Sequence, residues 1–187
     1  MTTRIAVDLD NTIFDTTSVY RSLIESCNCE YRPLRSYNPY ETGYPIEVVH
    51  VLENLFYSDE LCNAGVFDAR IPTILNSLTE NPHYELFYIT ERPMTQHMPS
   101  YNQLKRAGIV FQDSHLIHSK PKLDALKEHE IDLCFDDAPH VVNDCIANNI
   151  DVVMISNYDT AYNHHLRDSV EHYPNLITAF KSRGLIK

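Results

Sequence analysis

Short runs of apolar residues alternate with stretches of helical spacing along most of the chain. Four of these runs are strong and rich in β-branched or aromatic residues, and they cover residues 4–10, 84–90, 131–137 and 151–157. A weaker fifth run covers residues 115–119. Runs of this kind with helices between them are typical of a parallel sheet that is covered by helices on both faces. The pattern therefore predicts an α/β fold with a three-layer, Rossmann-like parallel sheet.

Between these runs, apolar residues recur at the three- to four-residue spacing that is typical of a helix. The spacing predicts helices that are marked by Leu75 and Leu78, by Leu104, by Leu123 and Leu126, by Val141, Val142 and Cys145, and by the range 176–181. Pro72 and Pro174 precede the first and last of these helices, and Gly108 ends the second. Strands and helices thus alternate over most of the chain.

The segment 16–67 breaks this alternation, because it has helical spacing but no convincing strand. Its apolar residues form two faces, one made by Val19, Leu23 and Ile24 and the other by Val48, Val49, Leu52, Leu55 and Phe56. The segment leaves the carboxyl end of the first strand, which is the edge where open α/β sheets bind ligands. We therefore expect residues 1–15 and 68–187 to form the α/β core, and residues 16–67 to form a small helical cap over the site.

The overall charge argues against a protein that binds nucleic acid. The 187 residues include 15 Lys plus Arg and 26 Asp plus Glu, which gives a net charge of −11, and no basic patch stands out. No run approaches the roughly 20 apolar residues that span a bilayer, and the N-terminus lacks a secretion signal pattern. We expect a cytoplasmic protein that binds neither nucleic acid nor membrane. The oligomeric state stays open, a homo-oligomer included.

The cysteines indicate neither a disulfide framework nor a zinc site. There are five of them, an odd number, and no two stand in a C-x-x-C pair. We expect mostly buried, reduced thiols at Cys27, Cys29, Cys62, Cys134 and Cys145.

Three of the four strong runs end in residues that carry chemistry rather than in neutral turn residues. Their ends read DLDNT (8–12), YITERP (88–93) and CFDDAP (134–139). Because parallel strands bring their carboxyl ends to one edge of the sheet, four aspartates are expected to converge there: Asp8, Asp10, Asp136 and Asp137. Carboxylates that converge repel one another unless a cation neutralises them, and oxygen ligands indicate Mg²⁺ rather than zinc.

These motifs together resemble a known enzyme family. DLDNT, Thr90 after an apolar strand, Lys120 or Lys122 before a helix, and FDD at 135–137 resemble the four motifs of the haloacid dehalogenase-like (HAD) phosphohydrolases. The resemblance covers about residues 1–15 and 84–157, and the cap has no sequence match of its own. Within the family, the chain is most similar to the 5′(3′)-deoxyribonucleotidase branch, through the inserted cap, the segment IDLCFDDAP, and TAYN at 160–163, which is similar to the branch's Ala-Pro-Tyr-Asn without its proline.

The resemblance implies a role for each aspartate. Asp8 would be the nucleophile that forms an aspartyl-phosphate, and Asp10 would be the general acid and base. The Asp8 and Asp136 side chains and the backbone carbonyl of Asp10 would hold Mg²⁺. Asp137 would assist the metal through water or by orienting its neighbour.

Thr90 and four neighbouring residues are candidates for contact with the phosphate or the rest of the substrate. The Thr90 hydroxyl would donate a hydrogen bond to a phosphoryl oxygen. Backbone N–H groups that follow Asp8 and Thr90 would assist, which brings in Asn11, Thr12 and Glu91. Arg92 is a candidate for a second contact with phosphate or substrate.

The active-site lysine stays open between two positions. Lys120 stands where a strand ends and Pro121 opens a helix, and for that reason it is slightly preferred. Lys122 lies 14 residues before Asp136, a separation that looks more like the family's.

The combined prediction is a Mg²⁺-dependent phosphomonoesterase that acts on a small phosphorylated metabolite. A nucleoside monophosphate is the favoured substrate, which would make the protein a 5′-nucleotidase or 5′(3′)-deoxyribonucleotidase. Aromatic residues of the cap are expected either to stack on a base or to pack the insert, and they are Tyr37, Tyr40, Tyr44, Phe56 and Tyr57. The alternatives are a phosphatase of another small phosphorylated metabolite and a non-catalytic phosphate-binding module.

Overall fold

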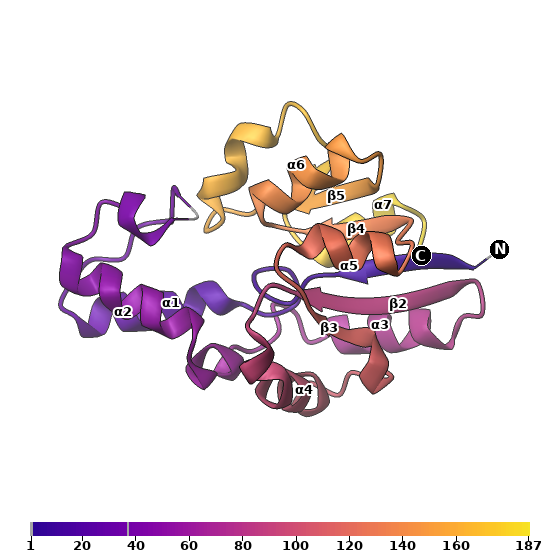
Figure 1. Ribbon diagram of the computed structural model, residues 1–187, viewed down its shortest axis with the longest axis horizontal. Coiled ribbons are helices and arrows are strands. Elements are labelled where there is room, and N and C mark those ends of the chain that lie inside the picture. The colour runs from indigo at the N-terminus through magenta and orange to yellow at the C-terminus, as the bar shows by residue number, and fades with distance from the viewer. Residues whose placement is uncertain (1, 37) are drawn as a thin grey trace.

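The five apolar runs form the parallel sheet that their pattern predicts, and a two-residue strand extends it. The computed structural model describes residues 2–36 and 38–187. Its strands are β1 (Thr3–Val7), β2 (Tyr84–Thr90), β3 (Leu116–His118), β4 (Leu133–Asp136), β5 (Asp151–Ile155) and β6 (His172–Tyr173). Neighbouring strands are parallel, in the order β3-β2-β1-β4-β5-β6. β1 therefore lies inside the sheet between β2 and β4 (Figure 1).

Helices cover both faces of this sheet. The α-helices are α1 (Thr16–Ser26), α2 (Ile46–Phe56), α3 (Ile71–Glu80), α4 (His97–Arg106), α5 (Lys122–Glu128), α6 (Pro139–Ala147) and α7 (Leu176–Ser182). Short 3₁₀ helices cover Pro39–Glu41, Asp59–Asn63, Met94–Gln96, Asp113–His115 and Ala161–Leu166. In β1, Ile5 and Val7 pack with α3, α4 and α7, whereas Ala6 packs with α5 and α6 on the opposite face. The three-layer α/β fold expected from the sequence is confirmed.

Two details of the strands differ from the sequence pattern. The first run was expected to continue to residue 10, but β1 ends at Val7. The chain turns there, because the Leu9 carbonyl accepts hydrogen bonds from the N–H groups of Ile13 and Phe14 and Asn11 adopts a left-handed φ of 55°. β6 was not predicted, because two residues are too few to produce an apolar run.

The segment between β1 and α3 is helical, and we call it the cap. Figure 1 shows α1 and α2 beyond one end of the sheet, while the N-terminus lies at the other end. Ile24, Val48 and Leu52 form a small core of their own. This core is separate from the two apolar clusters on the faces of the sheet.

The two chain segments that connect the cap to the core run side by side. The Asp15 N–H donates to the Gly65 carbonyl at 2.8 Å, and the Phe67 N–H donates to the Ile13 carbonyl at 3.1 Å. An antiparallel bridge joins Phe14 to the returning segment between these two bonds. We call residues 13–15 the outgoing linker and residues 61–67 the return linker. The insert thus starts and ends at the same place on the core.

Two further expectations concern the whole chain. Within the described ranges, no helix is both long and apolar enough to cross a bilayer. All five cysteines are free, and three of them are buried: Cys62, Cys134 and Cys145.

Candidate active site

Three acidic residues meet where β1 and β4 end. Asp8 directly follows β1, Asp136 ends β4, and Asp137 follows it. The two strands are neighbours, and the Asp8 N–H donates to the carbonyl of Phe135 in β4 at 3.0 Å. Carboxylate oxygens of the three aspartates lie within 4.8 Å of one another, and all three side chains are buried. The convergence follows from the sheet order, which makes the carboxyl ends of β1 and β4 adjacent.

Lys122 lies inside this cluster. Its ammonium Nζ is 2.7 Å from Asp8 Oδ1 and 2.5 Å from Asp136 Oδ2, and only 3% of its side chain is exposed. Lys120 lies elsewhere: it is exposed, and its Nζ is 5.4 Å from the ring centroid of Phe56 in the cap. The preference for Lys120 is therefore not supported by the geometry. Lys122 is the first residue of α5, and that position directs its side chain back toward the strand ends.

The charges of the cluster do not balance. Burial raises the pKa of Asp8, and Asp136 and Asp10 raise it further, while Lys122 opposes the change. Burial also raises the pKa of Asp137, with Asp8 and Asp136 adding to the effect. Burial would lower the pKa of Lys122, but the two carboxylates beside it outweigh burial and raise it. With all groups ionised, three carboxylates and one ammonium leave two negative charges in a buried space.

The donor atoms of the cluster fit a hard divalent cation. Asp8 Oδ2 is buried and has no hydrogen-bond partner among the described residues, so it is available as a ligand. Asp136 Oδ1 accepts the Ala138 N–H at 2.9 Å, which orients the carboxylate. Carboxylate oxygens and an excess of two negative charges are what Mg²⁺ prefers in proteins. Asp8, Asp136 and Asp137 are therefore the residues that could hold a metal.

Asp10 lies outside this cluster, because its carboxylate pairs with Arg92. Arg92 Nε donates to Asp10 Oδ2 at 2.9 Å and Nη2 donates to Asp10 Oδ1 at 2.7 Å. The Arg92 side chain is 0% exposed, whereas that of Asp10 is 22% exposed. All three guanidinium nitrogens of Arg92 already donate to acceptors within the protein, so the structure does not support the predicted contact of Arg92 with phosphate or substrate. The guanidinium of Arg92 instead forms a bidentate ion pair with the Asp10 carboxylate.

The other candidates for substrate contact are held by neighbours within the protein. Asn11 Nδ2 donates to the Tyr162 hydroxyl at 3.0 Å, and Asn11 Oδ1 accepts from Thr16 Oγ1 at 2.8 Å. The Asn11 N–H is also engaged, with the Phe14 carbonyl at 2.8 Å. The Thr12 hydroxyl is buried and has no partner among the described residues. Asn11 therefore links the site to the start of α1, and the Thr12 side chain is buried.

Thr90 and Glu91 follow each other at the end of β2. Thr90 Oγ1 is buried and accepts the Arg92 N–H at 3.2 Å. Glu91 pairs with His140 in the first turn of α6, where the two side-chain atoms are 2.9 Å apart. Burial would raise the pKa of Glu91, but the hydrogen bond to His140 and its charge lower it below the usual value. The carboxylate of Glu91 is thus committed to His140.

Sequence reasoning missed the contacts of the segment 160–163. The Tyr162 hydroxyl donates a short hydrogen bond to Asp137 Oδ2. Asn163 Nδ2 donates to the backbone carbonyl of Asp137 at 2.7 Å and to the Ile155 carbonyl at 2.9 Å. The only signal for these contacts was the likeness of TAYN to a family segment, which carried no role. These two residues orient Asp137 from the side opposite to β1.

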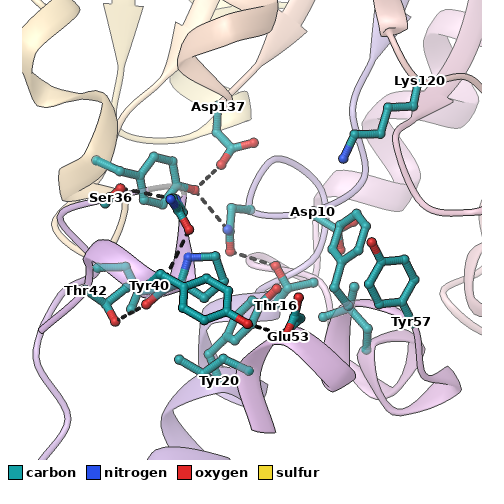
Figure 2. Close-up of a pocket in the computed structure, with 18 residues that line it drawn as sticks. Asp10, Thr16, Tyr20, Ser36, Tyr40, Thr42, Glu53, Tyr57, Lys120 and Asp137 are labelled. Atoms are coloured by element: carbon teal, nitrogen blue, oxygen red, sulfur yellow. Dashed lines mark hydrogen bonds between the residues drawn. The ribbon is translucent and has the colours of Figure 1, made fainter. Parts of the chain in front are cut away.

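A cavity of about 290 Å³ lies between the cap and the part of the core that includes Asp137. Figure 2 shows Asp137 and Lys120 reaching it from the core and Tyr40, Glu53 and Tyr57 reaching it from the cap. Asp10, Asn11 and Tyr162 complete the core side, and the cap side is made by Thr16, Tyr20, Leu34, Ser36, Asn38, Pro39, Thr42, Leu52, Phe56 and Leu61. The cavity therefore combines an acidic floor with a largely apolar and aromatic roof.

Four of the five cap aromatics lie among the described residues, and they divide between the cavity and the interior of the cap. Tyr40, Phe56 and Tyr57 line the cavity. Tyr44 packs against the small core of the cap, and its hydroxyl accepts the Arg32 N–H at 2.7 Å. Tyr37 lies outside the described residues.

The comparisons with known proteins identify the fold. A scan with protein-family models and a search of curated proteins gave no match. Among solved structures, a haloacid dehalogenase-like hydrolase from Streptococcus pneumoniae is similar over 96% of this chain and 98% of its own, with a TM-score of 0.59 and 16% identity. A predicted phosphatase from Clostridium acetobutylicum is similar over 99% of this chain and 99% of its own, with a TM-score of 0.59 and 15% identity.

A third structure, of a HAD-type hydrolase from Bacillus subtilis bound to magnesium, is similar over 98% of this chain and 99% of its own, with a TM-score of 0.56 and 13% identity. The protein therefore has the α/β fold of the HAD hydrolases. At these identities the likeness extends to the fold alone.

Proposed function

We propose that this protein is a Mg²⁺-dependent phosphomonoesterase that works through an aspartyl-phosphate on Asp8. The observation that carries the proposal is the buried cluster of Asp8, Asp136, Asp137 and Lys122, of which Asp137 lines the cavity. Two features of the cluster are not expected of a purely structural salt bridge: three carboxylates face a single ammonium, and Asp8 Oδ2 has no hydrogen-bond partner among the described residues. The fold supports the proposal, since the similar structures include hydrolases and a predicted phosphatase.

Asp8, Asp136 and Asp137 would hold the metal. When bound, Mg²⁺ supplies positive charge that neutralises the cluster and withdraws electron density from the phosphoryl oxygens. The magnesium bound to the Bacillus subtilis hydrolase of the same fold supports this choice. As the resemblance to the HAD family implies, the backbone carbonyl of Asp10 would be a further ligand, while the Asp10 carboxylate pairs with Arg92.

The reaction is proposed to proceed in two steps. In the first, a carboxylate oxygen of Asp8 forms a bond to phosphorus, the ester P–O bond breaks, and Asp10 gives a proton to the leaving oxygen. In the second, a water molecule gives its proton to Asp10 and attacks the phosphorus, and inorganic phosphate leaves as Asp8 is restored. In both steps Lys122 orients Asp8 by donating a hydrogen bond to its Oδ1.

Thr90 is proposed to bind a phosphoryl oxygen. Its Oγ1 already accepts the Arg92 N–H, and among the described residues the hydroxyl makes no other hydrogen bond. The hydroxyl hydrogen is therefore available to a ligand. Donors that are fixed before the substrate arrives stabilise the charge that develops on the phosphoryl group.

The favoured substrate is a nucleoside monophosphate, so the activity would be that of a 5′-nucleotidase or a 5′(3′)-deoxyribonucleotidase. Tyr40, Phe56 and Tyr57 offer rings on which a base can stack, and the Glu53 carboxylate in the same cavity can accept hydrogen bonds from the base. The main alternative is another small phosphorylated metabolite, and a non-catalytic phosphate-binding module is the second.

The test measures phosphate release by the purified full-length protein in Mg²⁺ and in EDTA. The substrates are 5′- and 3′-nucleoside monophosphates of both sugars, ribose 5-phosphate and p-nitrophenyl phosphate. We expect Mg²⁺-dependent turnover that falls to background in folded Asp8→Asn, because an amide cannot form the acyl phosphate. A folded Asp8→Asn protein with a tenth of wild-type turnover would exclude Asp8 as the nucleophile. Binding of inorganic phosphate without turnover of any ester would favour the binding module instead.

A further inference from the structure

We infer that Arg92 is a positioning residue that fixes the carboxylate of Asp10 and connects it to the return linker of the cap. The inference rests on the proposed function, because it takes Asp10 as the general acid and base. In this inference Arg92 acts on the reaction by orienting Asp10, and not by contacting the substrate as its position after Thr90 first indicated.

At one end, Arg92 controls the orientation of Asp10. Two of its nitrogens donate to the two oxygens of the carboxylate, at 2.9 and 2.7 Å. A bidentate pair of this kind fixes the plane of the carboxylate as well as its position, which a single hydrogen bond does not. Asp10 is 22% exposed on the cavity side, so without the fork its side chain would be free to rotate.

At the other end, Arg92 is held by the core and by the cap. Arg92 Nη1 donates to Gln103 Oε1 at 2.8 Å, to Ser100 Oγ at 3.1 Å and to Cys62 Sγ at 3.1 Å. Gln103 Nε2 in turn donates to the Ala64 carbonyl at 2.9 Å. Cys62 and Ala64 belong to the return linker, so a chain of hydrogen bonds leads from the linker through Gln103 and Arg92 to Asp10.

The backbone of Arg92 is also held in place. Its N–H donates to Thr90 Oγ1 at 3.2 Å, and its carbonyl accepts a hydrogen bond from His118 Nδ1 at 3.0 Å. The guanidinium is fully buried, so water does not compete for these bonds, and a buried charge is costly to leave without partners. These contacts hold Arg92 in one conformation, and its two hydrogen bonds to Asp10 hold the Asp10 carboxylate in one orientation.

This arrangement couples the position of the cap to the chemistry. Proton transfer depends on the distance and angle between the acid and the leaving oxygen, and a misplacement of about 1 Å can cost about 100-fold in rate. When the return linker moves, Gln103 and Arg92 transmit the change to Asp10. We therefore expect Arg92 to set how well Asp10 delivers its proton, rather than how tightly the substrate binds.

The test uses two variants and a matched control in the full-length protein. Arg92→Lys keeps the charge but loses the fork. Gln103→Met removes both the bond to the Ala64 carbonyl and the acceptor of Arg92 Nη1, while the two bonds between Arg92 and Asp10 can still form. The control is Arg106→Lys, because Arg106 Nη2 donates to the Cys62 carbonyl of the same linker at 2.8 Å. It makes the same chemical change as the first variant, on a side chain that is not bonded to Asp10.

The readout is the ratio of kcat/KM for two kinds of ester. p-Nitrophenolate leaves without protonation, whereas an alkyl oxygen needs a proton, so only the alkyl ester depends strongly on a general acid. Thymidine 5′-monophosphate serves as the alkyl ester, or ribose 5-phosphate if the wild type turns it over faster. Arg92→Lys should lower kcat/KM for the alkyl ester about 100-fold and for p-nitrophenyl phosphate less than tenfold, with the loss in kcat. Gln103→Met should shift the ratio in the same direction, about tenfold, and Arg106→Lys should leave it within threefold.

Each outcome has a definite meaning. Equal losses for both esters in Arg92→Lys and Gln103→Met would overturn the inference, because a merely structural residue lowers the amount of active protein without changing the ratio. If Arg92→Lys does not fold, the result for Gln103→Met decides: an unchanged ratio of kcat/KM for the two esters in this folded variant would overturn the inference. Asp10→Asn separates the inference from the function: if that variant does not change the ratio, the role of Asp10 as general acid is wrong, and the inference falls with it.

Discussion

Replacing Lys122 by methionine should destabilise the protein far more than the same change at Lys120. Lys122 is 3% exposed and its ammonium lies 2.7 Å from Asp8 and 2.5 Å from Asp136, so the substitution leaves buried carboxylates without their counter-charge. Removing one partner of a buried ion pair costs about 3–5 kcal/mol. For a chain of this size each kcal/mol lowers the melting temperature by about 2–4 °C, so we expect a decrease of roughly 6–20 °C. Lys120→Met changes an exposed side chain and should stay within about 0.5 kcal/mol.

The measurement is urea unfolding in EDTA, followed by far-UV circular dichroism because the chain has no tryptophan. A double variant, Asp8→Asn with Lys122→Met, tests the cause, since it removes one negative charge together with the positive one. We expect it to be more stable than Lys122→Met alone, with an interaction energy of about 0.5–3 kcal/mol. A loss below about 1 kcal/mol in Lys122→Met, or a double variant less stable than the single one, would refute the charge argument.

Three other predictions follow from the same site. Mg²⁺ should raise the melting temperature relative to EDTA, by an amount equivalent to about 2.7 kcal/mol at 100 times its dissociation constant, and identical midpoints would remove the metal from the cluster. His140→Gln should destabilise the protein at pH 6 more than at pH 9: the bond to Glu91 raises the pKa of His140, so its contribution is present below the unfolded value of 6.5 and lost as pH rises through the folded one. The contribution of Glu91 to stability is present above its unfolded pKa of 4.5 and is lost as pH falls through its lowered folded pKa, so Glu91 stays ionised at both pH 6 and pH 9. Equal effects of His140→Gln at the two pH values would therefore show that the pair is not ionic. Tyr57→Ala should lower kcat/KM for a nucleoside monophosphate by roughly tenfold but spare ribose 5-phosphate, since base stacking contributes about 1–3 kcal/mol, and parallel losses would assign Tyr57 to packing.

The sheet and the acidic cluster were accessible from the sequence because both depend on local patterns. Buried parallel strands read as continuous apolar runs, and their topology brings the carboxyl ends together whatever the surrounding loops do. This is why the meeting of Asp8 with Asp136 could be expected from residues that are far apart in the chain.

The side-chain contacts that the sequence did not predict depend on side-chain direction. Lys120 and Lys122 are two residues apart, and only the start of α5 decides which of them points to the strand ends. Arg92 comes two residues after Thr90, but its partners Cys62 and Gln103 come from a linker and a helix that no local pattern brings to it. Tyr162 reaches Asp137 from a 3₁₀ helix with no periodic signal.

The pairing of the two linkers determines how much chain entropy is lost when the insert is closed into a loop. Residues 13–15 and 65–67 are joined by backbone hydrogen bonds, so for the core the whole cap is a closed loop between two adjacent points. The entropy of closing a loop grows only slowly with its length, so a longer or shorter insert at this position changes the stability of the core little. The entropy of loop closure thus sets little limit on how many residues the insert between the two linkers contains.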